Sequence, residues 1–195
     1  MLSFVSVGRW EPNAQGRLAE AALDLFLERG FDEATVAEIA ERAGLTERTF
    51  YRHFADKREV LFGGGGALSD LMANAVTDAP RSATPIDAVA AALEATTTIF
   101  DEARRPFARR RRAVITANPE LQERELVKLA SIASDMAAAL RRRGVDEPAA
   151  TLAAQAGITV FRAAFDQWVD ESEHRNLRRL LRASLKDLRS VLATT

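Results

Sequence analysis

The 195-residue sequence lacks cysteine, has only two histidines, and has no apolar run near the ~20 residues that span a bilayer. The absence of cysteine excludes disulfides and thiolate metal sites. The sequence has no glycine-rich phosphate loop after a predicted strand. It also has no recognisable pairing of a catalytic nucleophile with a general base. We therefore expect a soluble cytoplasmic protein that is not an enzyme, has no catalytic or metal-binding residues, needs no cofactor and contacts no membrane.

An excess of positive charge is also missing. The formal net charge is -1 at pH 7, and residues 1–62 carry more acidic than basic side chains. The composition alone thus gives no case for nucleic-acid binding. Positive charge is instead concentrated in residues 45–58. This segment carries Arg48, Arg52, His53, Lys57 and Arg58.

The only strong periodicity in the sequence is helical, with no alternating strand segments and no heptad array. An all-α fold of about nine helices is predicted, with three or four short helices first and five longer ones after them. The expected helices cover residues 13–29, 35–43, 46–54, a fourth that starts at Asp56 and continues or restarts over 68–77, and then 85–103, 106–117, 119–143, 148–170 and 176–192.

Residues 35–54 contain two short amphipathic helices around a turn at Gly44 and Leu45. Thr35 and Glu38 have capping-box spacing, and Thr46 is the predicted N-cap of the second helix. Phe50 and Phe54, four residues apart, are expected to bury one face of that helix. This pattern indicates a helix-turn-helix, whose second helix enters the major groove of DNA.

These residues, with others at fixed spacing over residues 17–61, resemble the N-terminal domain of TetR-type transcriptional regulators. The matching segments are Ala21-Ala22, Leu25-Phe26, Arg29-Gly30-Phe31, Thr35-Val36, Ile39-Ala40, Ala43-Gly44-Leu45, and residues 50–54 and 56–59. The resemblance implies an all-helical homodimer that binds a palindromic double-stranded DNA operator. It also implies a DNA-binding domain at residues 12–62 and a ligand-binding and dimerisation domain at residues 68–195.

Candidate DNA-contacting side chains follow from the chemistry and from the resemblance. Arg48 can bind guanine in a bidentate way, and threonine offers a hydroxyl and a methyl group to thymine. By position, the resemblance implies that Thr46, Arg48 and Thr49 lie near bases. It implies contacts to the DNA backbone by Thr35, Tyr51, His53 and Lys57, and Arg52 lies on the same predicted face.

Two segments depart from a regular helical pattern. Residues 63–66 are all glycine, which would cost roughly 2–4 kcal/mol in a helix interior. They predict either a break, as a loop or hinge, or a weak helix held by packing. Residues 104–112 hold six arginines. They are interpreted either as a solvated helix start paired with Glu102, Glu120 and Glu123, or as an anion site for a ligand phosphate.

The C-terminal part has candidates for an effector site and a dimer interface. An apolar or acyl-type effector is expected, and acyl-CoA is one candidate, because the segment from the arginines to residue 170 is weakly similar to acyl-CoA-sensing regulators. Aromatic residues at helical spacing are more often core than pocket lining, however. Predicted ligand-binding residues are Phe100, Phe107, Arg111, Ile115, Met136, Phe161, Phe165 and Trp168. Predicted dimer-interface residues are Ala153, Val160, Leu177, Leu181, Leu185 and Leu188; these could instead pack within their own domain.

The favoured function is a ligand-responsive transcriptional repressor, released from its operator by the effector. The alternative is a DNA-independent helical ligand-binding or adaptor protein. The acidic balance of residues 1–62 is the best support for that alternative.

Overall fold

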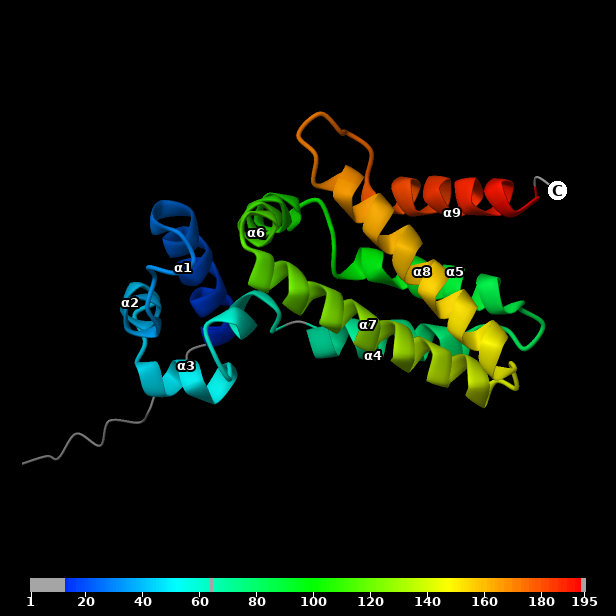
Figure 1. Ribbon diagram of the computed structural model, residues 1–195, viewed down its shortest axis with the longest axis horizontal. Coiled ribbons are helices and arrows are strands. Elements are labelled where there is room, and N and C mark those ends of the chain that lie inside the picture. The colour runs from blue at the N-terminus through cyan, green and yellow to red at the C-terminus, as the bar shows by residue number, and fades with distance from the viewer. Residues whose placement is uncertain (1–12, 64, 194–195) are drawn as a thin grey trace, which may run out of the picture. The chain divides into compact units, whose positions relative to one another are not determined.

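Figure 1 shows the computed structural model of the chain, which describes residues 13–63 and 65–193. Within those residues all regular structure is helical, with nine α-helices and two 3-10 helices. The predicted all-α class is therefore confirmed. The chain divides after Gly63 into two compact units. Residue 12, the predicted start of the DNA-binding domain, and residues 194–195 lie outside the described part.

The first unit contains three α-helices whose ends are set by local sequence. Thr35 caps α2, because its hydroxyl accepts the Glu38 amide at 3.2 Å while the Glu38 carboxylate accepts the Thr35 amide at 3.0 Å. The Thr46 hydroxyl accepts the Thr49 amide at 3.2 Å. Gly44 has a φ of 65°, which favours glycine in the turn. The helices are α1 (Ala14–Arg29), α2 (Val36–Arg42) and α3 (Glu47–His53).

The core of this unit is formed where the three helices meet. Phe50 of α3 is fully buried, and its ring centroid lies 5.4 Å from that of Phe54. These two aromatic rings fix one face of α3 inward, as predicted. The other buried apolar residues include Leu18, Ala22, Leu25, Phe26, Ile39 and Ala40.

The α-helix predicted to start at Asp56 is wrong, whereas a break at the glycines, one of the alternatives predicted for residues 63–66, is present. The Asp56 carboxylate accepts the amides of Arg58 and Glu59 at 2.8 and 3.1 Å, but only the short 3-10 helix η1 (Arg58–Leu61) follows. A new helix, α4 (Gly65–Asp78), begins beyond it. Gly63 precedes α4, and the next two described glycines open its first turn. No described glycine of the run therefore lies in a helix interior, where its conformational entropy would be costly.

The second unit is a bundle of longer helices. The helix α7 packs against α4, α6 and α8; α5 contacts α4 and α8, and α9 packs on α8 and α5. In the described residues no helix is both long and apolar enough to cross a membrane. The elements after α4 are α5 (Pro85–Ala95), η2 (Thr96–Thr98), α6 (Arg105–Ala117), α7 (Pro119–Arg142), α8 (Glu147–Trp168) and α9 (Leu177–Ala193).

The helix predicted over residues 85–103 ends earlier, at Ala95. The hydroxyls of Thr96, Thr97 and Thr98 each donate to the carbonyl three residues before, at 2.7, 2.8 and 2.8 Å. Threonine side chains that bond to nearby backbone groups compete with regular helix formation. Three in succession coincide with the change from α-helix to the 3-10 helix η2.

The end of α4 is held by a residue of the segment that follows α7. The Arg143 guanidinium donates to the carbonyls of Thr77, Ala79 and Pro80 at 3.2, 2.5 and 2.7 Å. A second polar contact joins the same two helices, because the Ser69 hydroxyl donates to the Asp135 carboxylate at 2.5 Å. The α4–α7 pair is thus joined by polar bonds as well as by apolar packing.

The close approach of α8 to α5 generates a prediction. A Cβ at Gly157 would lie 2.4 Å from Cγ1 of Val89. We expect Gly157→Ala to destabilise the protein by about 1–2 kcal/mol, because overpacking a rigid valine outweighs the better helix propensity of alanine. Thermal and urea unfolding of the full chain measure this.

The matched control is the same substitution in a Val89→Ala background, where the space is vacant. There, Gly157→Ala should raise stability. If the substitution has the same sign in both backgrounds, the packing explanation is wrong.

Candidate nucleic-acid interface and sensing-domain core

The outer face of α3 carries the polar and basic side chains predicted to meet DNA. Arg48, Tyr51, Arg52 and His53 are all exposed, and Tyr51 is 57% exposed. Since Phe50 holds the opposite face in the core, these four side chains share an accessible surface. The sequence therefore predicted which face of this helix points outward.

The side chains on this face differ in the hydrogen bonds and ion pairs that they make within the protein. Arg48 makes no hydrogen bond or ion pair with any other residue that the structure describes. The Arg52 guanidinium lies 3.5 Å from Nε2 of His53. The hydroxyls of Thr46 and Thr49 lie 3.1 Å apart and take part in capping. Arg48 is thus the least constrained cation on α3, while each threonine still offers its methyl group.

Thr35 and Lys57 were also predicted to contact the DNA backbone. Thr35 is exposed, and its hydroxyl takes part in the capping box of α2. Lys57 is half-buried, and its ammonium donates to the carbonyls of Phe31, Asp32 and Ala34. A phosphate contact by Lys57 stays a prediction, but the structure gives this residue a role that the sequence pattern did not indicate.

In the second unit, the predicted ligand-binding aromatics pack on one another. Phe100 lies 5.8, 5.2 and 6.3 Å, between ring centroids, from Phe161, Phe165 and Trp168. Trp168 is fully buried, and its indole nitrogen donates to Glu102 at 3.2 Å. Ile115 and Met136 are also fully buried, whereas Phe107 is half-buried. Apart from Phe107, these residues form the core or pack against it, and their contact with a ligand stays a prediction.

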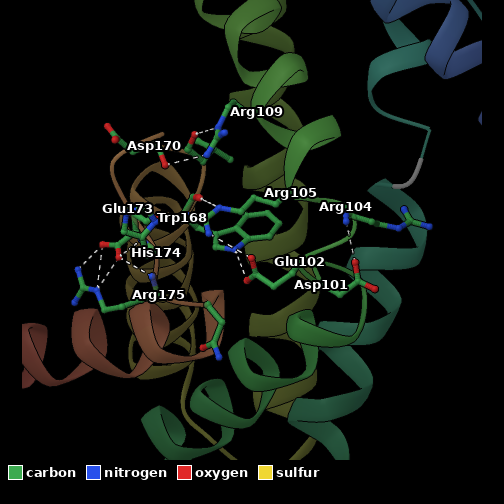
Figure 2. A network of polar contacts seen from close by, with 12 residues as sticks. Asp101, Glu102, Arg104, Arg105, Arg109, Trp168, Asp170, Glu173, His174 and Arg175 are labelled. Carbon is green, nitrogen blue, oxygen red and sulfur yellow. Dashed lines mark hydrogen bonds and ion pairs between the residues drawn. The ribbon is translucent and has the colours of Figure 1, made fainter.

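Two arginines at the start of α6 are bonded to the C-terminal end of α8, as Figure 2 shows. Arg105 donates from Nε to the Trp168 carbonyl at 2.6 Å, and also donates to the Glu173 carbonyl. Arg109 donates to the carbonyls of Val169 and Asp170 at 2.8 and 3.1 Å. A cation at a helix C-terminus is favourable, and the last carbonyls of a helix lack partners within it.

The last two arginines of the segment, Arg111 and Arg112, are paired with carboxylates. Glu125 of α7 lies 3.1 Å from Arg111 and 3.2 Å from Arg112, and Arg112 also lies 3.0 Å from Asp166 of α8. Burial lowers the pKa of Arg111, and the Glu125 carboxylate opposes that shift. Arg111, predicted to bind ligand, is therefore half-buried in an ion pair that joins α6 to α7.

One interpretation of residues 104–112 was that their arginines pair with Glu102, Glu120 and Glu123. In the part of the chain that the structure describes, only the pairing with Glu102 is present. Glu102 lies 3.3 Å from Arg105. The more extensive contacts are with Glu125, Asp166 and the carbonyls after α8, none of which the sequence analysis named. Sequence separation explains why the carbonyls were missed, since they lie about sixty residues beyond the arginines that bind them.

The predicted dimer-interface residues divide into two groups. Val160, Leu177 and Leu181 are 3%, 1% and 2% exposed, so their side chains belong to the core of a single protomer. Ala153, Leu185 and Leu188 are only partly buried. Leu152 of α8 and Val191 of α9, which are not among the six predicted interface residues, are 70% and 73% exposed. An apolar helical stripe does not by itself distinguish core from interface.

Two family models match the chain. Residues 18–62 match the model described as bacterial regulatory proteins of the tetR family. Residues 83–193, more than half of the chain, match the model described as the MftR C-terminal domain. The first match covers α1 through η1, and the second covers α5 to α9.

Curated relatives match over parts of their length. The chain is 37% identical over 79 residues to the HTH-type transcriptional regulator TcmR of Streptomyces glaucescens, covering 40% of this chain and 35% of that protein. It is 32% identical over 116 residues to the putative mycofactocin biosynthesis transcriptional regulator MftR of Mycobacterium tuberculosis, covering 60% of this chain and 58% of that protein. The chain thus spans about a third of the length of TcmR and somewhat more than half of the length of MftR.

A solved structure has the same fold. This is the transcriptional regulator FadR from Bacillus subtilis in complex with stearoyl-CoA, with a TM-score of 0.57 and 20% sequence identity. The alignment covers 89% of this chain and 96% of that one. At this identity the likeness establishes the fold, and the stearoyl-CoA belongs to that protein.

The contacts between α6 and the end of α8 generate a prediction. The Arg105 side chain is 12% exposed. We expect Arg105→Ala to lower stability by about 2–3 kcal/mol, because it removes bonds from a charged donor to two carbonyls. Urea unfolding gives the stability, and hydrogen exchange of residues 169–176 should become faster.

Arg104→Ala is the matched control, since Arg104 is exposed and its side chain bonds to no other residue in the described part of the chain. It should change stability by less than about 0.5 kcal/mol. Equal losses for the two variants would show that the arginine contacts to α8 do not stabilise the fold.

Proposed function

Because the chain belongs to the TetR family of bacterial regulatory proteins, we propose that it is a ligand-responsive transcriptional repressor. As a homodimer it binds a palindromic operator in double-stranded DNA, and a small apolar or acyl-type effector releases it. The protein acts in the cytoplasm, as a regulator rather than an enzyme. Family membership does not favour the DNA-independent alternative.

The observation that carries this proposal is the exposed face of α3. Arg48, without a partner in the described residues, is available to bind a guanine edge in the major groove. Thr46 and Thr49 lie near bases through their methyl groups, since their hydroxyls are bonded to each other. Tyr51, Arg52 and His53 bind phosphate oxygens, as does the N-terminus of α2 at Thr35.

The proposed effector is an elongated apolar molecule, with an acyl-CoA as the specific candidate. The aromatic cluster of Phe100, Phe161, Phe165 and Trp168 supports an apolar site. Arg111 is the cation best placed to meet an anionic group, and Glu125 would have to release it. The fold is shared with a regulator whose structure contains stearoyl-CoA.

The proposed dimer is formed by the outer faces of α8 and α9. Leu152 of α8 and Val191 of α9 are 70% and 73% exposed, and exposed apolar side chains favour association. Ala153 of α8 and Leu185 and Leu188 of α9 are half-buried. Two protomers also fit the geometry of major-groove binding, in which half-sites lie about 34–36 Å apart.

Substitution of Arg48 tests the proposed base contact. We expect Arg48→Ala to weaken specific operator binding by ~1–3 kcal/mol and to relax the sequence preference at one position per half-site. Fluorescence anisotropy with upstream DNA of the protein's own gene, at fixed salt, measures this. An unchanged ratio of specific to non-specific affinity would remove Arg48 from the residues that contact bases.

Substitution of Leu152 tests the proposed interface. We expect Leu152→Lys to shift the dimer to monomer in light scattering, because a charge would be buried in an apolar contact. Leu126→Lys is the matched control, since Leu126 of α7 is 50% exposed but lies outside the proposed interface. A dimer that persists with Lys at position 152, or is lost with Lys at position 126, contradicts this assignment.

A further inference from the structure

The Lys57 side chain occupies a site built from backbone carbonyls. Its ammonium nitrogen lies 2.6 Å from the Phe31 oxygen, 3.1 Å from the Asp32 oxygen and 3.0 Å from the Ala34 oxygen. It also lies 4.4 Å from the ring centroid of Phe31, which is a cation–π contact. The ammonium is therefore bound by the loop that joins α1 to α2.

All hydrogen-bond donors of Lys57 are in use in this arrangement. A lysine ammonium has three N–H groups and no acceptor. Three carbonyls accept from it here, so a bond to a DNA phosphate would require one of these bonds to break. Because Phe31 and Ala34 are 4% and 1% exposed, a carbonyl released at either residue would lose its partner next to a buried side chain.

The loop held by Lys57 determines where α2 begins. Ala34 directly precedes Thr35, the N-cap residue whose capping box starts that helix. At the other end of α2, the Arg17 guanidinium of α1 donates to the carbonyl of Ala43. Ala43 stands just before the turn at Gly44 that leads to α3. Both ends of α2 are thus held by cationic side chains from outside it.

We infer that Lys57 is a positioning residue of the DNA-binding unit and not a phosphate ligand. It fixes the loop that sets the start of α2, and through α2 and the turn it sets the orientation of α3. Positive charge in the sequence would assign Lys57 to the DNA backbone, but the geometry assigns it to the protein's own backbone. This inference rests on the proposed function for its DNA measurements.

The salt dependence of operator binding distinguishes the two roles. Each phosphate neutralised by a cationic side chain contributes about 0.9 to the slope of log K against log salt concentration on duplex DNA. For Lys57→Met in the full chain we expect an unchanged slope, with operator affinity about tenfold lower at every salt concentration. Arg52→Met, which removes a proposed phosphate contact, should lower the slope by about 0.9 per protomer.

The ratio of operator affinity to non-specific DNA affinity distinguishes positioning of α3 from a role of Lys57 in stability alone. Thermal unfolding establishes that Lys57→Met is folded at the assay temperature. For the folded variant, we expect lower affinity for the operator than wild type but the same affinity for non-specific DNA. A slope reduced as in Arg52→Met, or equal losses on both DNAs, overturns the inference.

Amine labelling of the wild-type protein tests the contact without any substitution. The chain has three lysines, Lys57, Lys128 and Lys186, so mass spectrometry after reductive methylation resolves each one. We expect Lys57 to react at least tenfold more slowly than the exposed Lys186, with or without DNA, since its donors are already bonded. A Lys57 that reacts as fast as Lys186 and becomes protected only with DNA overturns the inference.

If the wild type binds no DNA, the proposed function fails, and labelling of the free protein still reports on the Lys57 contact.

Discussion

Cationic side chains from other elements bond to the backbone carbonyls that follow helices in this protein. The last carbonyls of a helix have no partner within it, and they carry the negative end of the helix dipole. Arg143 bonds to the carbonyls at the end of α4, and Arg105 and Arg109 to those at the end of α8. Arg17 bonds to the end of α2, and Lys57 to the loop after α1. The same kind of interaction thus organises both units.

This use of cations changes how the sequence charge is interpreted. The first unit carries more acidic than basic residues, and two of its basic residues bond to its own backbone. Arg58 is 2.8 Å from Asp56, and Arg29 and Arg42 are paired with Glu38 and Glu28 at 2.6 Å. Among the described residues of this unit, Arg48 and Arg52 on α3 are the arginines proposed to contact DNA, together with His53. Affinity for DNA would therefore depend on a few side chains on one helix face, whose placement matters more than total charge.

Local sequence predicted the elements whose ends depend on local chemistry. The capping box at Thr35, the N-cap at Thr46, the turn at Gly44 and the buried pair Phe50 and Phe54 are all present as expected. The end of α5 was misjudged, since three threonine hydroxyls bond to the backbone where the apolar pattern continues. The start of an α-helix at Asp56 was also misjudged, whereas the glycines correctly indicated a possible break before α4. Local signals thus fixed helix starts better than helix ends.

The roles of the cations could not be predicted from local sequence. Nothing near Arg105 indicates that its partner is the carbonyl of Trp168, because that contact depends on how α6 and α8 pack. The same limit applies to the leucine stripe of α9. Leu177 and Leu181 are core and Leu188 is half-buried, although all belong to one continuous apolar face. Only the packed structure shows which leucines of this face are buried in the core and which remain partly exposed.

The central claim is that α3 presents a sequence-specific DNA-binding surface from a symmetric dimer. Sequencing of the genomic fragments retained by the purified full-length protein tests it most directly. The account predicts one enriched inverted repeat with half-site centres about 10 base pairs, or a multiple of that, apart. Retained fragments that share no motif, or a motif without two-fold symmetry, would contradict it.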